Sequence, residues 1–194
     1  MGVWIMNRDK IIDKLQSKLT EKRLLHSIGV EFTAASMAMV YGVDIEKARM
    51  AGLLHDCAKG LSAKEKIEKA KKHGISISDY EEKNPEMLHA KLGAYYAKTK
   101  YGVLDEDVLN AITYHTTGRP DMSLLEKIIF VADYIEPGRK MLDELPEIRK
   151  EAFSDIDKCV IHILKNTIAY LKEIADDMDI TTQETYDFYC GLSK

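Results

Sequence analysis

The feature that most limits what this chain can fold into is a repeated helical pattern. A capping residue is followed by apolar residues at three- and four-residue spacing, and then by a glycine. Alternating apolar and polar residues, which are typical of strands, are scarce. No heptad repeat persists along the chain. The pattern therefore predicts an all-α, compact multi-helix fold rather than a coiled coil.

Capping residues and glycines set the expected helix boundaries. Ser62 and Ser123 each precede a glutamate by three residues, which predicts a capping box, and Asn84 with Pro85 predicts another helix start. We expect helices over 20–41, 44–60, 62–74, 84–102, 105–116, 124–135, 155–178 and 182–190. The first of these carries an apolar stripe that should face the core. The stripe consists of Leu25, Ile28, Phe32, Ala35 and Met39.

Composition limits the class of protein and its partners. The chain has 194 residues, 45% of them hydrophobic, which is enough for one sizeable core. Because no low-complexity linker divides it, we expect a single domain over 1–194, with a motif core at 20–140 and C-terminal helices at 147–190. The formal net charge is -4, and because a protein that tracks the phosphates of nucleic acid is normally basic, no nucleic-acid partner is expected.

Cysteine usage and hydropathy bear on location. The 3 cysteines form no CxxC pair, so neither a disulfide framework nor a cysteine zinc site is indicated, and a reducing cytoplasm fits best. The N-terminal residues lack a signal-peptide pattern, and no apolar stretch approaches the roughly 18 residues that span a bilayer. We therefore expect a cytoplasmic protein without a membrane partner.

Asp133 is the most informative anomaly in the pattern. It follows Leu125 and Ile129 at four-residue spacing, which places it on the inward side of a strongly apolar helix. An unpaired carboxylate there would be costly. A salt bridge or a helix cap would explain it, but the dipole near a helix C-terminus opposes negative charge. We favour a cation ligand.

Histidines also occupy positions where the helical pattern asks for apolar residues. His55, His89 and His115 each extend an apolar stripe, and His26 lies near Gly29, where another backbone or a ligand can approach closely. Taken singly, each is more often a hydrogen-bonded core histidine than a ligand. Together with two aspartates, they favour a metal site.

The adjacent pair His55-Asp56 can reach one centre only if that centre lies near the end of its helix, because neighbouring residues on a helix point about 100° apart. Gly60, shortly afterwards, favours such an end. Imidazole nitrogens with carboxylate oxygens suit iron, manganese or zinc and leave positions open for water and substrate. We expect His73 and His162 to be structural, His73 as a helix-end cation and His162 because no acidic companion is evident.

Other catalytic classes lack their motifs. Glu86 and His89 form one Glu-x-x-His element, whereas carboxylate-bridged di-iron bundles need two. The chain contains no GxxxxGK[ST] phosphate loop, no GxGxxG turn and no GxSxG elbow. No motif in the sequence therefore supports a Ser/His/Asp hydrolase mechanism.

The order of these residues resembles that of a known superfamily. The set His26, His55-Asp56, His89, His115 and Asp133 is similar to the pattern of the HD-domain metal-dependent phosphohydrolases. The surrounding segments more closely resemble the bacterial YqeK family of symmetrical diadenosine-tetraphosphate hydrolases. These segments are 23–27, 55–60, 88–90, 114–118 and 132–139. With helices continuing on both sides, the likeness covers nearly the whole chain.

This resemblance implies cleavage of a dinucleoside tetraphosphate at its middle, which releases two nucleoside diphosphates. Iron is the expected metal, with manganese, cobalt or zinc left open. Asp56 and Lys59 are the implied catalytic residues, while a second ion near His89 and His115, and a homodimer, are left open. The implied metal ligands are His26, His55, Asp56 and Asp133. The implied substrate-binding residues are Arg23, Lys59, His89, His115, Thr116 and Arg139.

The chemistry of these residue types agrees with that assignment. A divalent ion lowers the pKa of bound water toward neutrality, so no serine or cysteine nucleophile is required. Lys59 lies one helical turn after His55 and offers a point charge to a phosphate. Arg139 follows the Pro137-Gly138 turn and could grip phosphate oxygens in a bidentate way.

Two other functions stay open at this level. One is a nucleotidase or triphosphohydrolase acting on mononucleotides, which would release phosphate or triphosphate instead of two diphosphates. The other is a nucleotide sensor that binds without turnover. Within the superfamily, Ala58, Lys59 and Gly60 follow the His-Asp pair where the alarmone-hydrolysing branch has acidic residues. The Gly-Tyr-Pro motif of the cyclic-dinucleotide branch is missing.

Overall fold

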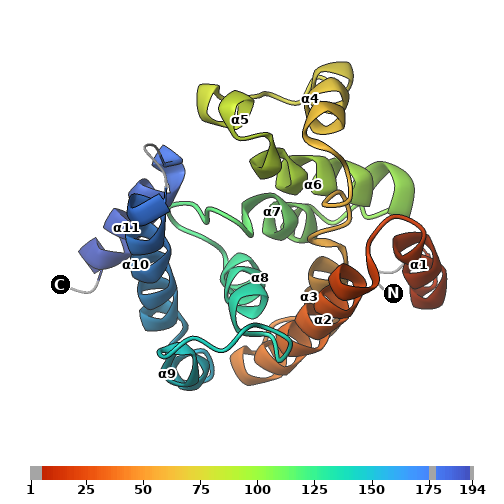
Figure 1. The fold of residues 1–194 in the computed structure, drawn as a ribbon. Coiled ribbons are helices and arrows are strands. Elements are labelled where there is room, and N and C mark those ends of the chain that lie inside the picture. The colour runs from red at the N-terminus through yellow and green to blue at the C-terminus, as the bar shows by residue number, and fades with distance from the viewer. Residues whose placement is uncertain (1–5, 175–177, 193–194) are drawn as a thin grey trace.

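The structure is a computed structural model that describes residues 6–174 and 178–192, and every regular element within them is helical (Figure 1). The expected all-α fold is therefore confirmed. The elements are α1 Arg8–Gln16, α2 Glu21–Tyr41, α3 Ile45–Leu54, α4 Ala63–Lys72, α5 Asp79–Lys83, the short 3₁₀ helix η1 Pro85–Met87, α6 Leu88–Tyr101, α7 Glu106–Tyr114, α8 Leu124–Ile135, α9 Leu145–Glu151, α10 Ile156–Ile174 and α11 Ile180–Leu192.

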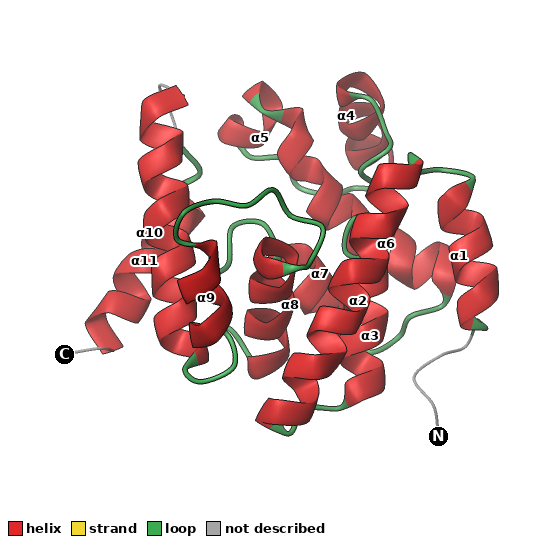
Figure 2. Ribbon diagram, turned by 60° about the horizontal axis from the view of Figure 1, so that its bottom comes forward, coloured by secondary structure: helices red, strands yellow, loops and turns green. Residues whose placement is uncertain are grey.

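Helix α8 lies at the centre of the molecule. It packs against α2, α3, α7 and α10, so that α2 and α3 lie on one side of it and α10 with α11 on the other (Figure 1). Figure 2 shows α8 in the same central place from a second direction. Its side chains are buried along almost its whole length, as expected of a helix that neighbours surround. A polar group on α8 is therefore held deep inside the fold.

Both predicted capping boxes are present. The amide of Glu65 donates to Ser62 Oγ over 3.3 Å, and the amide of Ser62 donates to Glu65 Oε2 over 2.9 Å. Ser123 and Glu126 make the same reciprocal pair at the start of α8. Because the cap fixes where α8 begins, the helix runs over 124–135 as expected, and Asp133 falls in its last turn.

The predicted apolar stripe of α2 is wrong for three of its members. The exposed fractions of Leu25, Phe32 and Met39 are 61%, 54% and 64%. Helix α2 packs on α3 through smaller side chains: a Cβ added at Gly52 would lie 2.9 Å from the Cα of Glu31. Helix α2 also buries Leu24, Val30 and Met37, so its inward face lies beside the predicted stripe. The small residues that α2 buries are Ser27, Ala34, Ala35 and Ala38.

Several boundaries also differ from expectation, and the helix expected over 155–178 includes 175–177, which lie outside the described residues. Helix α3 ends at Leu54, and 55–60 form tight turns in which Cys57 N donates to Leu54 O over 3.0 Å and Lys59 N to Asp56 O over 2.8 Å. Asn84 makes no side-chain cap, and α6 begins only after η1. Helices α1 and α5 were not expected, although Ser78 and Glu81 form a capping box at the start of α5.

Helix α2 is long and apolar enough to cross a membrane by length and composition alone, contrary to the expectation of no such segment. Its best window has a mean hydropathy of 1.2, and 44% of that window is buried inside the protein. The helix packs against α3 and α8. A core helix of a soluble protein passes the same test, so this is weak support for a membrane segment.

Candidate metal centre

The four predicted ligands meet at one place, although they are far apart in the chain. His26 comes from the second turn of α2, His55 and Asp56 from the turn after α3, and Asp133 from the last turn of α8. His26 Nε2 lies 2.9 Å from Asp133 Oδ1, and His55 Nε2 lies 3.7 Å from the same oxygen. Asp56 Oδ2 lies 3.5 Å from His55 Nε2. Each of the four side chains thus has a ligand atom within 3.7 Å of a ligand atom of another.

His89 and His115 approach Asp56 from its other oxygen. Asp56 Oδ1 lies 3.3 Å from His89 Nε2 and 3.8 Å from His115 Nε2, and the two ring nitrogens are 3.1 Å apart. The structure therefore contains three groups of side chains with ligand spacing, and Asp56 belongs to two of them. A carboxylate in this position can serve a cation on either side.

Backbone carbonyls determine which ring nitrogen faces the centre. His55 Nδ1 lies 2.7 Å from Gly52 O, and His115 Nδ1 lies 2.7 Å from Ile112 O, so each Nδ1 carries a proton and donates it. His89 Nδ1 lies against a backbone carbonyl in the same way. In a neutral imidazole, Nε2 then keeps a free lone pair. All three histidines direct that nitrogen toward Asp56.

Three of the predicted ligand atoms are buried without a hydrogen-bond partner among the described residues. They are His26 Nε2, His55 Nε2 and Asp56 Oδ1. Orphaned buried acceptors cost free energy unless something pairs with them. The lone pair of His55 Nε2 and the carboxylate oxygen Oδ1 of Asp56 can both bind a divalent cation. The residues present therefore fit such an ion.

The directions of the pKa shifts indicate that positive charge is favoured between the carboxylates of Asp56 and Asp133. Burial opposes ionisation of Asp56, but the facing imidazoles of His55, His89 and His115 hold its pKa well below the usual value. Burial lowers the pKa of His115 to about 4, and it also lowers that of His89. Burial alone would do the same to His55, but Asp56 and Asp133 raise the pKa of His55 above its ordinary value. A metal ion would supply the charge that these carboxylates attract.

Glu136 holds His26 in place, a role that the sequence did not indicate. His26 Nδ1 lies 3.0 Å from Glu136 Oε1, and the amide of Gly138 donates to Glu136 Oε2 over 2.6 Å. A Cβ added at Gly29 would lie 2.5 Å from Glu136 Oε2, so only glycine leaves room for this carboxylate. Gly29 was expected to admit a backbone or a ligand, and it is the side chain of Glu136 that approaches it closely. Glu136 directs His26 Nε2 toward Asp133, as outer carboxylates do for ligating histidines.

The two predicted arginines lie against the two aspartates. Arg23 Nη1 donates to Asp56 Oδ2 over 2.7 Å. Arg139 donates to Asp133 twice, from Nη2 to Oδ1 and from Nε to the backbone oxygen, each over 2.6 Å. Their side chains are 35% and 38% exposed, so both guanidinium groups are open to a ligand as well. Arg119, by contrast, pairs with Glu126.

Lys59 and Thr116 complete the cluster on the side of His89. Lys59 Nζ lies 3.3 Å from His89 Nδ1, and Thr116 Oγ1 lies 3.1 Å from His115 Nε2. Burial lowers the pKa of Lys59. The structure thus brings all ten predicted site residues together, while the role of each stays a prediction.

A cavity of ≈ 860 Å³ opens beside the cluster, between the start of α2 and the loop over 136–140. His26, Arg23 and Arg139 lie in its wall. Its volume is in the range of sites that hold small molecules. The cluster is therefore accessible to a ligand from this side.

The two remaining histidines lie outside the cluster. His73 ends α4, and its Nδ1 lies 3.0 Å from the hydroxyl of Tyr95, which agrees with a structural role. His162 has acidic neighbours after all: its Nδ1 lies 2.8 Å from Glu151 Oε2, and its Nε2 lies 3.3 Å from Glu144 Oε2. The expectation that His162 lacks an acidic companion is wrong, because α9 supplies Glu151 and the residue just before α9 supplies Glu144.

Comparison with known proteins places this cluster in a family. The HD domain family matches residues 23–138, a span that contains nine of the ten site residues, and Arg139 follows directly. The chain belongs to the HD domain family. A symmetrical bis(5'-nucleosyl)-tetraphosphatase of Halalkalibacterium halodurans is 43% identical over 94% of this chain and 96% of its own length. An enzyme of the same name from Bacillus subtilis is 40% identical over 94% of this chain and 97% of its own.

A solved structure agrees with the HD-domain fold throughout. It is a Clostridium acetobutylicum protein described as a predicted HD superfamily hydrolase involved in NAD metabolism. The TM-score is 0.93 at 44% sequence identity, over 96% of this chain and 98% of that chain. The resemblance to HD phosphohydrolases and to symmetrical tetraphosphatases that the sequence motifs indicated is therefore confirmed.

Proposed function

We propose that this HD domain hydrolyses diadenosine tetraphosphate or a related dinucleoside tetraphosphate symmetrically, into two nucleoside diphosphates. One observation carries the proposal: His55 Nε2 and Asp56 Oδ1 are orphaned inside a cluster of histidines and aspartates, next to two arginines that face an open cavity. Relatives at 40% and 43% identity over most of the chain bear the name of this activity.

The metal ligands in this proposal are His26, His55, Asp56 and Asp133. When bound, a divalent ion lowers the pKa of water toward neutrality so that hydroxide can attack phosphorus. When no second cation binds beside His89 and His115, Asp56 Oδ1, which has no hydrogen-bond partner among the described residues, can orient the attacking water. No serine or cysteine nucleophile is needed.

The basic side chains hold the phosphate chain and offset its charge. Arg139 turns two nitrogens toward Asp133, and the same fork can take two phosphate oxygens at the mouth of the cavity. Arg23 lies on the opposite side, against Asp56. Lys59 offers a point charge near His89, and Thr116 a hydroxyl. Charge that builds on the phosphate in the transition state thus meets fixed positive groups.

The native metal in this proposal is iron, with manganese, cobalt and zinc as the alternatives for this nitrogen and oxygen ligand set. The close approach of His89 and His115 to Asp56 Oδ1 supports a second cation there. Cytoplasmic location and a homodimer complete the proposal. Light scattering on the purified protein tests the dimer, and a mass equal to one chain would contradict it.

Chromatography of the reaction products tests the proposed function. We expect diadenosine tetraphosphate to yield ADP as the sole nucleotide product. Equal amounts of ATP and AMP would contradict symmetrical cleavage. Release of phosphate or triphosphate from mononucleotides, with the dinucleotide intact, would point to a nucleotidase. Binding without turnover under iron, manganese and cobalt would point to a sensor.

A further inference from the structure

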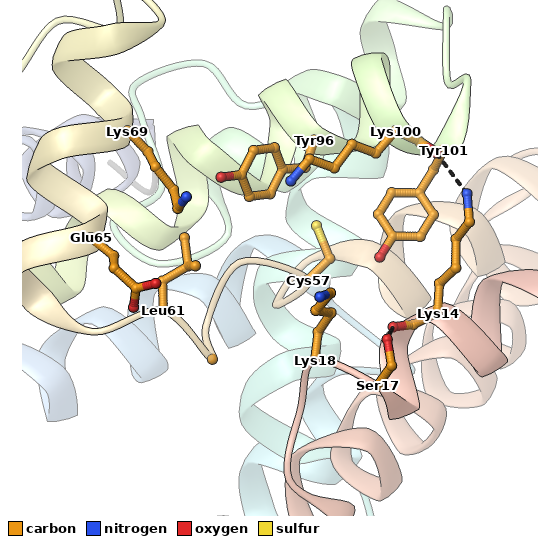
Figure 3. Close-up of a pocket in the computed structure, with 11 residues that line it drawn as sticks. Lys14, Ser17, Lys18, Cys57, Leu61, Glu65, Lys69, Tyr96, Lys100 and Tyr101 are labelled. Carbon is orange, nitrogen blue, oxygen red and sulfur yellow. Dashed lines mark hydrogen bonds between the residues drawn. The ribbon is translucent and has the colours of Figure 1, made fainter.

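A second cavity, of ≈ 670 Å³, lies next to the turn that carries His55 and Asp56 (Figure 3). Its wall comes from α1 and the segment after it, the turn over 57–61, α4, and the end of α6. Cys57 is part of this wall, whereas the preceding Asp56 belongs to the metal centre. None of the ten predicted site residues lines this cavity. It is a separate feature of the molecule.

The charges around this cavity are strongly unbalanced, in a chain whose net charge is -4. Four lysines line it and one glutamate, Glu65. Glu65 is engaged elsewhere, because its Oε2 accepts from Ser62 N over 2.9 Å and from Ser62 Oγ over 2.7 Å. Within the described residues, none of the four ammonium groups pairs with a carboxylate inside 4.0 Å. The lysines are Lys14, Lys18, Lys69 and Lys100.

The contacts that these lysines do make are with neutral groups. Lys100 Nζ lies 3.3 Å from the centroid of the Tyr96 ring, and Lys14 Nζ donates to the backbone oxygen of Lys100 over 3.3 Å. Burial lowers the pKa of Lys100, and repulsion from Lys69 and Lys18 lowers it further. Positive charges therefore repel one another across the cavity. An anion bound between them would remove that repulsion.

The geometry suits an extended anion better than a single charge. Figure 3 shows the amino groups of Lys18 and Lys69 directed into the space between their elements, and the hydroxyl-bearing rings of Tyr96 and Tyr101 beside them. The lysines come from separate segments on different sides of the space. Several ammonium groups spaced around one hollow match several phosphates in a chain.

We propose that this cavity binds the phosphate chain of a soluble oligophosphate. The site goes beyond the proposed hydrolysis and does not depend on it, since no proposed catalytic residue lines it. Its ligand would lie against Cys57, the residue that follows Asp56 in the catalytic turn.

Site-resolved acetylation of lysines on the metal-loaded protein tests this proposal. Inorganic tripolyphosphate and ADP are the two probes, and added sodium chloride at equal ionic strength is the reference. Acetylation of Lys18, Lys69 and Lys100, read by mass spectrometry, should slow by about tenfold when the probe is at ten times its Kd. The exposed lysines Lys72 and Lys83 should react at unchanged rates.

A pair of matched variants ties protection to the cavity. Lys69→Met with Lys100→Met should abolish protection of Lys18, whereas Lys72→Met with Lys83→Met removes the same charge and should leave it intact. Protection by tripolyphosphate shows that a phosphate chain suffices, and protection by ADP alone shows that the nucleoside is also required. Equal protection of all lysines, no protection, or Lys18 protection that survives in the first variant would overturn the proposal.

Discussion

At the scale of single residues, Asp56 divides the site into two halves. Its Oδ2 faces Arg23 and His55, and its Oδ1 faces His89 and His115. Because the side chain is almost completely buried, neither oxygen is solvated by bulk water. Each oxygen therefore needs a cationic or proton-donating partner. A histidine whose Nε2 has a free lone pair meets this need only when a cation or a proton lies between that nitrogen and the carboxylate oxygen.

Arg139 should act on the substrate and not on the metal. Arg139→Ala should lower kcat/KM for diadenosine tetraphosphate by about 10- to 100-fold, because a charge-assisted bidentate contact is lost. Metal content, measured by elemental analysis, should stay unchanged. Arg139→Lys keeps the charge without the fork and should recover only part of the activity. Wild-type kinetics in the alanine variant would show that Arg139 is an ordinary surface residue without a role in substrate binding.

Gly29→Ala tests the positioning of His26 by Glu136. The new Cβ would lie 2.5 Å from Glu136 Oε2 and should displace the carboxylate from the His26 ring. We expect metal affinity to fall by about 10- to 100-fold, as it does when outer-shell partners are lost. Titration of the metal-free protein measures this. Gly191→Ala, where no atom lies within 4 Å of the added Cβ, is the matched control and should bind normally.

The sequence indicated the cluster because charged residues stood on apolar stripes, where burial demands a partner. It could not indicate Glu136, whose contact exists only because the loop after α8 folds back onto Gly29. His162 was misread for a similar reason. Its partners Glu144 and Glu151 lie on and just before α9, a helix that showed no periodic signal of its own.

At the scale of elements, helix ends carry the site. The last carbonyls of a helix have no intrahelical partner. At the end of α3, Gly52 O accepts from His55, and at the end of α7, Ile112 O accepts from His115. In each case, one hydrogen bond therefore pairs a carbonyl at the end of the helix and also fixes the orientation of the histidine ring. This explains why α3 stops before His55 instead of continuing to Gly60.

Gly52→Ala should weaken the α2–α3 contact that sets His26 opposite His55. The added Cβ would lie 2.9 Å from the Cα of Glu31, and a helix backbone cannot move away without disturbing its neighbours. We expect the free energy of unfolding to fall by about 1–3 kcal/mol, measured by urea titration. Gly191→Ala should leave it unchanged or slightly higher. Equal stability of the two variants would contradict close packing at Gly52.

Capping boxes made α4 and α8 predictable, since Ser-x-x-Glu acts locally. The buried face of α2 was not predictable in the same way. Leu25, Phe32 and Met39 are exposed, whereas Leu24, Val30 and Met37 on the same helix are buried. Because α2 carries apolar residues on more than one side, only its contacts with other helices decide which of them face inward.

At the scale of the whole molecule, the site joins segments from most of the chain. Its residues range from position 23 on α2 to position 139 after α8, and α8 is the central helix. An ion held by side chains from α2, α8 and the turn after α3 would link these elements directly. Metal binding should therefore contribute to the stability of the entire fold.

Metal should raise the thermal midpoint of the protein. At free metal of about 100 times its Kd, binding adds about 2.7 kcal/mol, which corresponds to a Tm increase of about 5 to 10 °C for a domain of this size. Thermal unfolding with and without chelator measures the shift. An increase of the same size in the Asp133→Ala variant would show that the stabilising ion binds elsewhere.

The most direct test of the central claim is the metal content of purified wild type and Asp133→Ala, measured by elemental analysis next to a circular dichroism spectrum. We expect at least one transition-metal ion per wild-type chain. We expect the variant to be folded, to retain almost no metal and not to cleave diadenosine tetraphosphate. A variant with the full metal content, or a wild-type enzyme that is active without any metal, would contradict it.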